Sequence, residues 1–138
     1  MAARIAIVGG GASGVLVAVN LVRAMRHQAE IIIIERRSNL GRGLAYSTSD
    51  PSHLLNVRVA NMSAFPNDPE HFLNWLKLIG PAFGIDHPAH FLFVPRSVYG
   101  AYLESLLDER APYGIRVLSS SCEDIAEQGD EVQLRLAD

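Results

Sequence analysis

The sequence contains a single cysteine, Cys122, among 138 residues, so no disulfide can form within the chain. Without a second cysteine in a Cys-x-x-Cys spacing, a redox-active disulfide is disfavoured, and we expect a buried, inert thiol. The scarcity of cysteine weakly favours a reducing, cytoplasmic location. The net charge is only −3 and no basic block stands out. Nucleic acid is therefore not expected as a partner.

No apolar run is both long and uninterrupted. Residues 5–22 are rich in apolar side chains, but three consecutive glycines at 9–11 break the run, and Ser13 and Asn20 lie inside it. A membrane span or a signal peptide does not explain these interruptions, whereas a strand, a turn and a helix do. We therefore expect no membrane partner.

Several catalytic signatures are also missing. No Gly-Lys-Ser/Thr follows the glycines, which excludes a P-loop, and Ser13 lacks the spacing of a serine nucleophile elbow. His87 and His90 have no cysteine or carboxylate cluster beside them, so we expect no metal site. No residue can be named as a catalytic acid or base.

The pattern that remains predicts an α/β fold in a single domain. We expect a Rossmann-like parallel sheet with flanking helices and a C-terminal β-hairpin. Ile31 to Ile34 are four consecutive β-branched residues, typical of a central parallel strand. The expected parallel strands are 4–8, 29–35 and 115–118, the helices are 12–27, 69–79 and 96–110, and the hairpin strands are 124–127 and 132–136.

Details of these elements can also be predicted. Asn20, Arg23 and His27 form a polar stripe on the first helix, and residues 36–69 are mainly loop. Asp68 is expected to cap the second helix. We expect two apolar faces to be inward, one on each later helix: Phe72, Trp75, Leu76 and Ile79, and Val98, Tyr102, Leu103 and Leu106.

The strongest local signal is a G-x-G-x-x-G pattern between the first strand and the first helix. Gly9 permits the tight turn, Gly11 lets a pyrophosphate approach the backbone, and Gly14 lets the helix pack closely on the strand. Ala12 and Ser13 open the helix, whose N-terminus offers free N–H groups to phosphates. The context predicts binding of a dinucleotide.

Glu35 lies 21 residues after Gly14, where an acidic residue accepts hydrogen bonds from the adenosine ribose. Its charge suits the free 2′-hydroxyl of FAD or NAD and suits NADP less well. Arg36 and Arg37 leave NADP open, because arginine can pair with a 2′-phosphate. FAD is the favoured cofactor.

Beyond the glycine turn and Glu35-Arg36-Arg37, several segments resemble the bacterial FAD/NAD(P)-binding oxidoreductases, which are distantly similar to the monooxygenases of ornithine and lysine side-chain amines. Leu-Leu-Asn-Val and Arg-x-x-Tyr-Gly-x-Tyr are the more specific parts. The segments are 41–47, 51–57, 61–64, 68–76 and 95–103.

The resemblance implies that FAD is reduced by NAD(P)H, and that the loop after Glu35 passes near the flavin. Gly41, Arg42 and Gly43, with Asn56 and Met62, would line that path. Arg96 would lie near the cofactor phosphates, and a cation at a helix start hints at an anion nearby. Packing of Arg96 over Tyr99 is the equal alternative. Phe72, Trp75, Tyr99 and Tyr102 are expected in the core.

The resemblance also implies further segments that hold the flavin ring, so residues 1–138 are expected to be the N-terminal part of an FAD/NAD(P)-binding domain. Alone they would bind FAD weakly and not turn over. Two other interpretations stay open: the NAD(P)-binding domain of a flavin-free dehydrogenase, and a non-catalytic nucleotide-binding module. The small-molecule substrate is unknown, and a homo-oligomer is possible through an open sheet edge.

Overall fold

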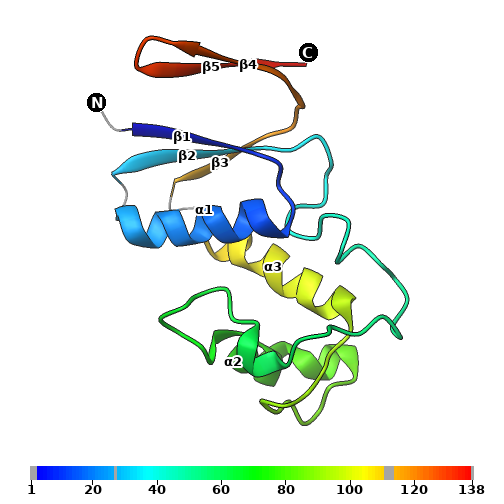
Figure 1. The fold of residues 1–138 in the computed structure, drawn as a ribbon. Coiled ribbons are helices and arrows are strands. Elements are labelled where there is room, and N and C mark those ends of the chain that lie inside the picture. The colour runs from blue at the N-terminus through cyan, green and yellow to red at the C-terminus, as the bar shows by residue number, and fades with distance from the viewer. Residues whose placement is uncertain (1–2, 27, 111–113, 138) are drawn as a thin grey trace.

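A three-stranded parallel sheet forms the centre of the protein, whose computed structural model describes residues 3–26, 28–110 and 114–137. The strands follow the order β1 (Ala3–Val8), β2 (Ala29–Ile34) and β3 (Ile115–Leu118). Helices α1 (Ala12–Met25) and α3 (Arg96–Arg110) lie on one side of the sheet, and the hairpin lies on the other (Figure 1). The predicted α/β class is confirmed.

The central strand β2 owes its position to its isoleucines. Ile31 and Ile33 pair in register with Ile5 and Ile7 of β1, so these side chains share one face of the sheet. Ile31 and Ile33 are fully buried, whereas the flanking strands are largely exposed or half-buried. A run of β-branched residues therefore predicts the middle strand correctly, because only the middle strand has neighbours on both edges.

Helix α1 ends at Met25 because Arg26 adopts a left-handed conformation with φ of 44°. His27, the last residue of the predicted helix, lies outside the described residues. The predicted polar stripe faces a loop: Asn20 Nδ2 donates to the Ala64 carbonyl at 2.9 Å, and the Arg23 guanidinium lies 3.2 Å from the Phe65 ring centre. These contacts attach the long loop to α1.

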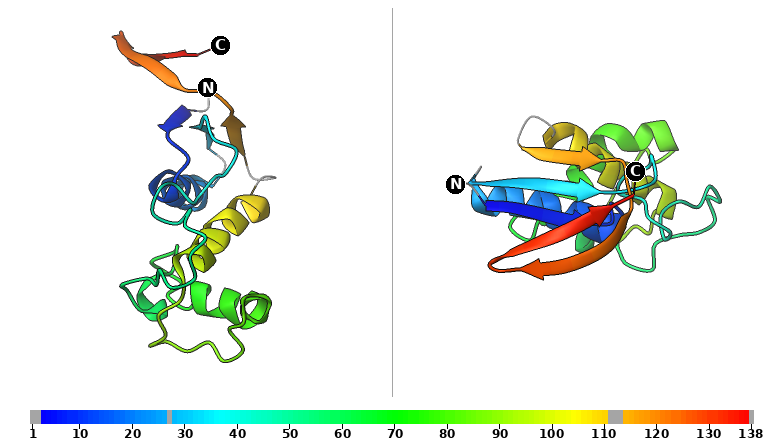
Figure 2. Two further views of the ribbon diagram at one scale, coloured as in Figure 1. Left: turned by 90° about the vertical axis from the view of Figure 1, so that its right-hand side faces the viewer. Right: turned by 90° about the horizontal axis from the view of Figure 1, so that it is seen from above.

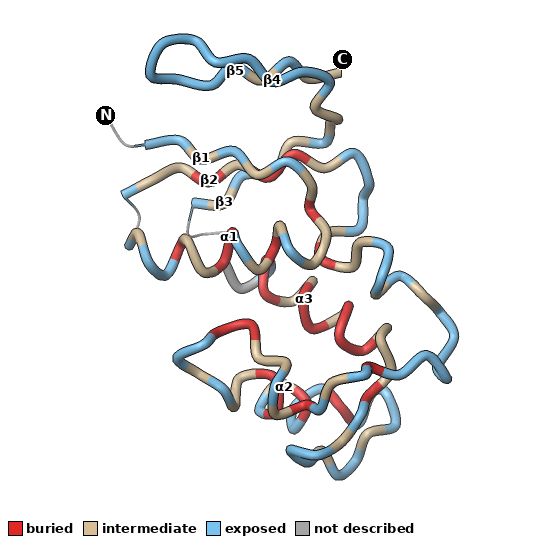
Figure 3. The backbone as a smooth tube through the Cα atoms, in the orientation of Figure 1, coloured by how far each residue is buried: buried red, intermediate tan, exposed pale blue. Residues whose placement is uncertain are grey.

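A further layer lies beyond α3, on the side away from the sheet. It contains α2 (His71–Ile79) and two short 3₁₀ helices, Val59–Asn61 and Gly80–Phe83 (Figure 2). Its chain path is held at Leu54, which forms an isolated antiparallel bridge with Pro95. The loop predicted at 36–69 is therefore ordered by contacts with distant residues. Figure 3 shows buried residues in β2 and in α1, α2 and α3, and an exposed hairpin.

The predicted start of α2 needs correction. The helix begins at His71 with Glu70 at the cap, and no side chain caps it. Asp68 acts through its backbone, since its carbonyl accepts a hydrogen bond from the His71 N–H at 3.1 Å. A turn over 69–70 therefore occupies the predicted first turn of the helix.

The inward face of α2 also differs from the prediction by one position. Leu73 is buried beside Phe72 and Leu76, whereas Ile79 is 42% exposed. Trp75 is partly buried and packs against the core. Ile79 lies where the helix gives way to the following 3₁₀ turn, so it leaves the apolar stripe.

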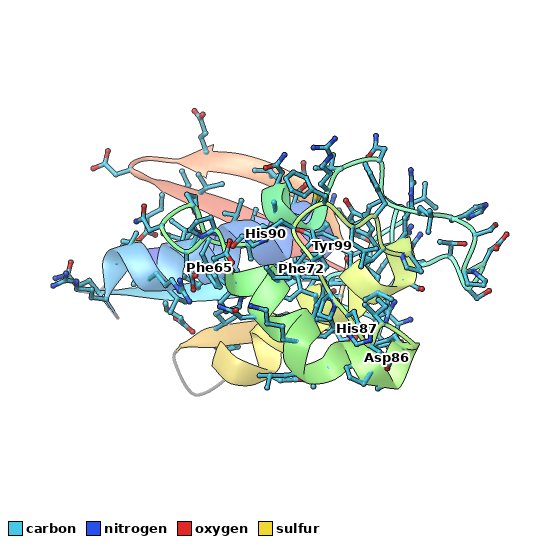
Figure 4. All side chains as sticks on the ribbon, turned by 90° about the horizontal axis from the view of Figure 1, so that it is seen from below. Phe65, Phe72, Asp86, His87, His90 and Tyr99 are labelled. Atoms are coloured by element: carbon cyan, nitrogen blue, oxygen red, sulfur yellow. The ribbon has the colours of Figure 1, made fainter. Side chains whose placement is uncertain are left out.

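Helix α3 joins the layers through a core of aromatic side chains. The predicted inward residues Val98, Tyr102, Leu103 and Leu106 are all buried, and so is Tyr99. Phe72 contacts both tyrosines, with ring centres 5.2 Å and 4.6 Å apart. Figure 4 shows Phe72 of α2 and Tyr99 of α3 close together. None of the helices in the described residues is long and apolar enough to cross a membrane.

The predicted hairpin is confirmed, but its strands are longer than expected: β4 (Cys122–Gln128) begins two residues earlier and ends one later, and β5 (Glu131–Leu136) begins one residue earlier. It begins at Cys122, which is half-buried, so the expectation of a buried thiol is wrong. Ile125 and Val132 are about 60% exposed because this end of the hairpin stands clear of the parallel sheet (Figure 2).

Tyr102 supplies a stability test of the joint between the layers. Its fully buried hydroxyl accepts a hydrogen bond from the Ala64 N–H at 3.1 Å and lies 2.7 Å from His71 Nδ1. Tyr102→Phe should lower the free energy of unfolding by about 1–3 kcal/mol, since it leaves the amide without its acceptor. Urea unfolding measures this.

Tyr99→Phe is the matched control. Tyr99 is almost fully buried, and burial raises the pKa of its hydroxyl. Within the described residues no side chain or backbone group hydrogen-bonds that hydroxyl, so its removal should leave the unfolding free energy nearly unchanged. Equal losses in both variants would contradict the assigned role of the Tyr102 hydroxyl.

Candidate dinucleotide-binding site

The glycine turn brings the end of β1 and the start of α1 into very close contact. Gly9 has φ of +101°, a conformation that side chains rarely adopt, and its N–H bonds the Ile34 carbonyl at 2.9 Å. A Cβ on Gly14 would lie only 2.0 Å from the Gly9 carbonyl oxygen. Glycine at position 14 is therefore what allows the helix to start directly against the strand end.

The N-terminus of α1 is left open to a ligand. Gly11 occupies the cap position, no side chain caps the helix, and its first turn contains no acidic residue. The first intrahelical bond runs from the Val15 N–H to the Gly11 carbonyl, so helix geometry leaves the N–H groups of Ala12, Ser13 and Gly14 without a partner in the helix. These groups and the helix dipole favour an anion at this place.

Glu35 follows β2 and reaches the same turn. Its Oε2 accepts a hydrogen bond from the Gly10 N–H at 2.8 Å, and its Oε1 accepts one from the Arg37 N–H at 2.8 Å. The bond from Arg37 is the main cause that lowers the pKa of Glu35 below 4.5, burial opposes it, and the bond from Gly10 adds to it. The carboxylate is thus held ionised beside the glycine turn.

Two hollows flank this arrangement. One, which we call the polar hollow, has a volume of about 470 Å³. The other, which lies at the glycine turn and which we call the turn hollow, has a volume of about 590 Å³. Both volumes lie in the range typical of ligand sites. The polar hollow is lined by Glu35, Arg36, Arg37, Ser38, Asn39, Gly43 and Ser47. The turn hollow is lined by Ile7, Val8, Gly9, Gly11, Ala12, Ser13, Gly14, Val17, Arg42, Gly43, Leu44 and Ala45.

Most of the predicted site residues meet at these two hollows, on either side of Gly43. Arg96 lines neither of them, and neither does Gly41. The Arg96 Nε donates to the Leu54 carbonyl at 3.3 Å and its N–H to the His53 carbonyl at 2.8 Å. A contact between Arg96 and cofactor phosphates stays a prediction. Asn56 and Met62 line neither hollow either.

Arg42 lines the turn hollow, but its guanidinium is bound elsewhere. It forms a bidentate pair with Glu104 of α3, with N···O distances of 2.7 Å and 3.0 Å. Sequence reasoning missed Glu104, which lies 62 positions away. It also missed Ser38, Asn39 and Ser47, because small polar residues in a loop carry no signal that sets them apart.

The histidines disfavoured as zinc ligands have other surroundings. His90 Nε2 lies 2.8 Å from Glu70 Oε1, whereas His87 is exposed beside Asp86 in another part of the surface (Figure 4). Within the described residues no group of three or more histidine, cysteine or acidic side chains is placed to hold a metal ion.

Comparison with known proteins agrees with this geometry. Residues 6–138 match the FAD-NAD(P)-binding family. The chain belongs to this family. The family implies a dinucleotide as the class of cofactor, and the resemblance inferred from the sequence is confirmed.

A curated relative is the 3-dehydro-bile acid delta(4,6)-reductase of Clostridium scindens, which is 32% identical over 77 residues. The match covers 56% of this chain and 19% of that protein. The chain therefore matches only a small part of its relative.

Solved structures share the fold across nearly the whole chain. S-allyl-L-cysteine S-oxygenase from Allium sativum has a TM-score of 0.60 at 18% identity, covering 96% of this chain and 31% of that one. FqzB has a TM-score of 0.59 at 13% identity, covering 97% and 32%. The Diels-Alderase PyrE3 of pyrroindomycin biosynthesis has a TM-score of 0.53 at 18% identity, covering 96% and 29%. The chain spans about a third of each.

The lack of space for a side chain at Gly14 gives a second stability test. Gly14→Ala should lower the free energy of unfolding by about 3 kcal/mol or more, because the methyl group forces α1 away from the Gly9 carbonyl. Gly11→Ala is the control. The φ of −74° at this position suits alanine, and the added Cβ would lie 3.3 Å from its nearest neighbour, Gly43 Cα, instead of 2.0 Å. Thermal unfolding compares them, and equal melting temperatures would contradict the close packing.

Glu35 predicts a pH dependence. Because its folded pKa is lowered, the carboxylate stabilises the fold above 4.5, the ordinary pKa, and this contribution disappears as pH falls through the folded pKa. Glu35→Gln should cost about 1 kcal/mol at neutral pH, after allowance for solvent screening. The difference from wild type should vanish in acid.

Urea unfolding at several pH values measures this difference. Glu127→Gln, which removes an exposed carboxylate of the hairpin, serves as the control and should show no such pH-dependent difference. A stability difference between Glu35→Gln and wild type that is constant with pH would show that the carboxylate charge is not its source.

Proposed function

We propose that this chain binds FAD through its ADP half and forms the FAD-binding part of a flavin-dependent, NAD(P)H-linked oxidoreductase. The observation that carries the proposal is the junction of the two hollows at Gly43. The turn hollow is lined by the open N-terminus of α1, and the polar hollow is lined by the Glu35 carboxylate. A pyrophosphate suits the first, and an adenosine ribose suits the second.

The chemistry of the linings supports this assignment of the two halves. The turn hollow offers backbone N–H groups at a helix start and no acidic side chain. The polar hollow offers an ionised carboxylate that already accepts two N–H bonds and retains lone pairs for a hydroxyl. Its charge disfavours a 2′-phosphate, which favours FAD over NADP.

Electron transfer in the whole protein follows from the bound group. Bound FAD would supply the hydride and electron-transfer chemistry between a reduced nicotinamide and an acceptor, and the residues around Gly43, Glu35 and the start of α1 would bind and orient it. The relative from Clostridium scindens is named a reductase, which fits this role. A monooxygenase that passes the electrons to oxygen is the narrower version of the proposal.

One observation favours a second candidate. Arg36 and Arg37 are exposed in the polar hollow, and neither forms an ion pair within the described residues. They could hold the 2′-phosphate of NADP, as in a flavin-free dehydrogenase. The carboxylate of Glu35 in the same hollow weighs against this candidate, and the ligand test below separates the two.

The test is the shift in melting temperature of this chain with FAD, ADP, FMN, NAD and NADP at matched concentrations. FAD and ADP should raise the melting temperature and FMN should not, because FMN lacks the adenosine half. A ligand at a hundredfold excess over its Kd stabilises the folded form by about 2.7 kcal/mol. A marked preference for NADP would overturn the FAD proposal in favour of the dehydrogenase.

Gly11→Ala separates a site at the glycine turn from weak binding elsewhere. Its methyl group would project toward Gly43 Cα at 3.3 Å, where the two hollows meet, and the φ of −74° suits alanine, so that only a shift of Gly43 by a few tenths of an ångström is required. The variant should fold and lose most of the shift given by ADP. An unchanged shift would place the ligand elsewhere, and no shift in the wild type would contradict the proposal.

A further inference from the structure

The segment Gly41-Arg42-Gly43 lies between the glycine turn and helix α3. The Gly41 N–H donates to the Gly10 carbonyl at 2.7 Å. On its other side, a Cβ at Gly41 would lie 3.0 Å from Leu103 Cβ and 3.1 Å from the backbone nitrogen of Glu104. Gly41, with φ of +87°, is therefore wedged between the turn and α3.

Arg42 connects this segment to α3 through three of its hydrogen bonds and makes a fourth within the loop. Nε and Nη2 bind the two carboxylate oxygens of Glu104, and Nη1 donates to the Ser97 carbonyl at 3.0 Å and the Tyr46 carbonyl at 3.3 Å. Gly100 makes room for it, because a Cβ there would lie 2.6 Å from Nη1. The side chains of Arg42 and Glu104 are 22% and 36% exposed, so the pair is partly shielded from water.

The next residue, Gly43, carries this fixed position to the ligand site. A Cβ on Gly11 would lie 3.3 Å from Gly43 Cα, so the two backbones touch at the start of α1. Gly43 also lines both hollows. The place where the hollows meet therefore depends on where Arg42 is held.

We infer that the Arg42–Glu104 pair is a positioning device, which holds Gly43 against the glycine turn so that a pyrophosphate is bound by backbone N–H groups. This inference rests on the proposed function. Arg42, which the resemblance placed on the loop near the flavin, does not itself contact the phosphates, because its charge is compensated by Glu104 and four of its N–H groups are already used.

Substitution of Glu104 tests the inference, because the two possible roles of Arg42 predict opposite changes in ADP affinity. If Arg42 bound the phosphates directly, removal of the competing negative charge in Glu104→Gln would leave the arginine more available, and ADP would bind more tightly. If the pair positions Gly43, the same substitution weakens the clamp and ADP binds less tightly. Glutamine has almost the same size, so the fold is least disturbed.

The experiment measures the Kd of ADP by calorimetry at a temperature where circular dichroism shows every variant folded. Glu104→Gln should weaken ADP binding about tenfold, which corresponds to about 1.4 kcal/mol. Arg42→Lys should lose as much ADP affinity as Arg42→Gln, since lysine keeps the charge but not the forked geometry of the guanidinium. Asp108→Asn, which removes an exposed acid from the same helix, is the control and should bind as wild type does.

Two further readouts separate positioning from a merely structural role. The salt dependence of ADP binding should be the same in Arg42→Gln and wild type, because no phosphate contact is removed. Amide hydrogen exchange at Gly41 and Tyr46, whose N–H groups bond the Gly10 and Arg42 carbonyls, should be faster in Glu104→Gln and unchanged in Asp108→Asn.

The outcomes are distinct. Tighter ADP binding in Glu104→Gln, or retained binding in Arg42→Lys with loss in Arg42→Gln, would overturn the inference and make Arg42 a direct contact. Unchanged amide exchange in Glu104→Gln would overturn it independently of any ligand. Failure of the wild type to bind ADP or FAD would instead contradict the proposed function, whatever the exchange rates show.

Discussion

The arrangement of the site depends on the contact between Gly14 and the carbonyl of Gly9. No side chain fits between them, so the first turn of α1 lies directly against the end of β1. This contact sets the direction of the helix axis and hence of the free N–H groups at its start. Because Gly9 also bonds the Ile34 carbonyl, the end of β2 and the Glu35 that follows it are placed by the same turn.

Two charged side chains beside this turn already bind groups of the protein itself. Glu35 accepts N–H bonds from Gly10 and Arg37, and Arg42 is paired with Glu104. Such groups are already oriented before a ligand arrives, so little ordering remains to be done on binding. In the proposed function, recognition of the pyrophosphate is then left to backbone N–H groups, whose positions do not depend on rotamers.

The layer built from the long loop and α2 supports the site from a distance. The Tyr102 hydroxyl accepts the Ala64 N–H, and Asn20 of α1 donates to the Ala64 carbonyl, so a single loop residue connects α3 with α1. Helix α3 therefore has two functions: its aromatic face anchors the loop, and Glu104 holds the segment beside the glycine turn. A long loop without secondary structure can be well ordered when its contacts are of this kind.

Local patterns in the sequence determined strands β1 and β2, the glycine turn, helix α1 and the position of Glu35. Each of these depends on residues within a few positions or on the regular length of a βαβ unit. They also determined α3 and the hairpin. The tertiary structure alone decided that Arg42 pairs with Glu104, that Asn20 and Arg23 face a loop, and that Cys122 is half-buried. These outcomes depend on partners tens of residues away, and a side chain's own neighbours in the sequence carry no information about which distant group it will meet.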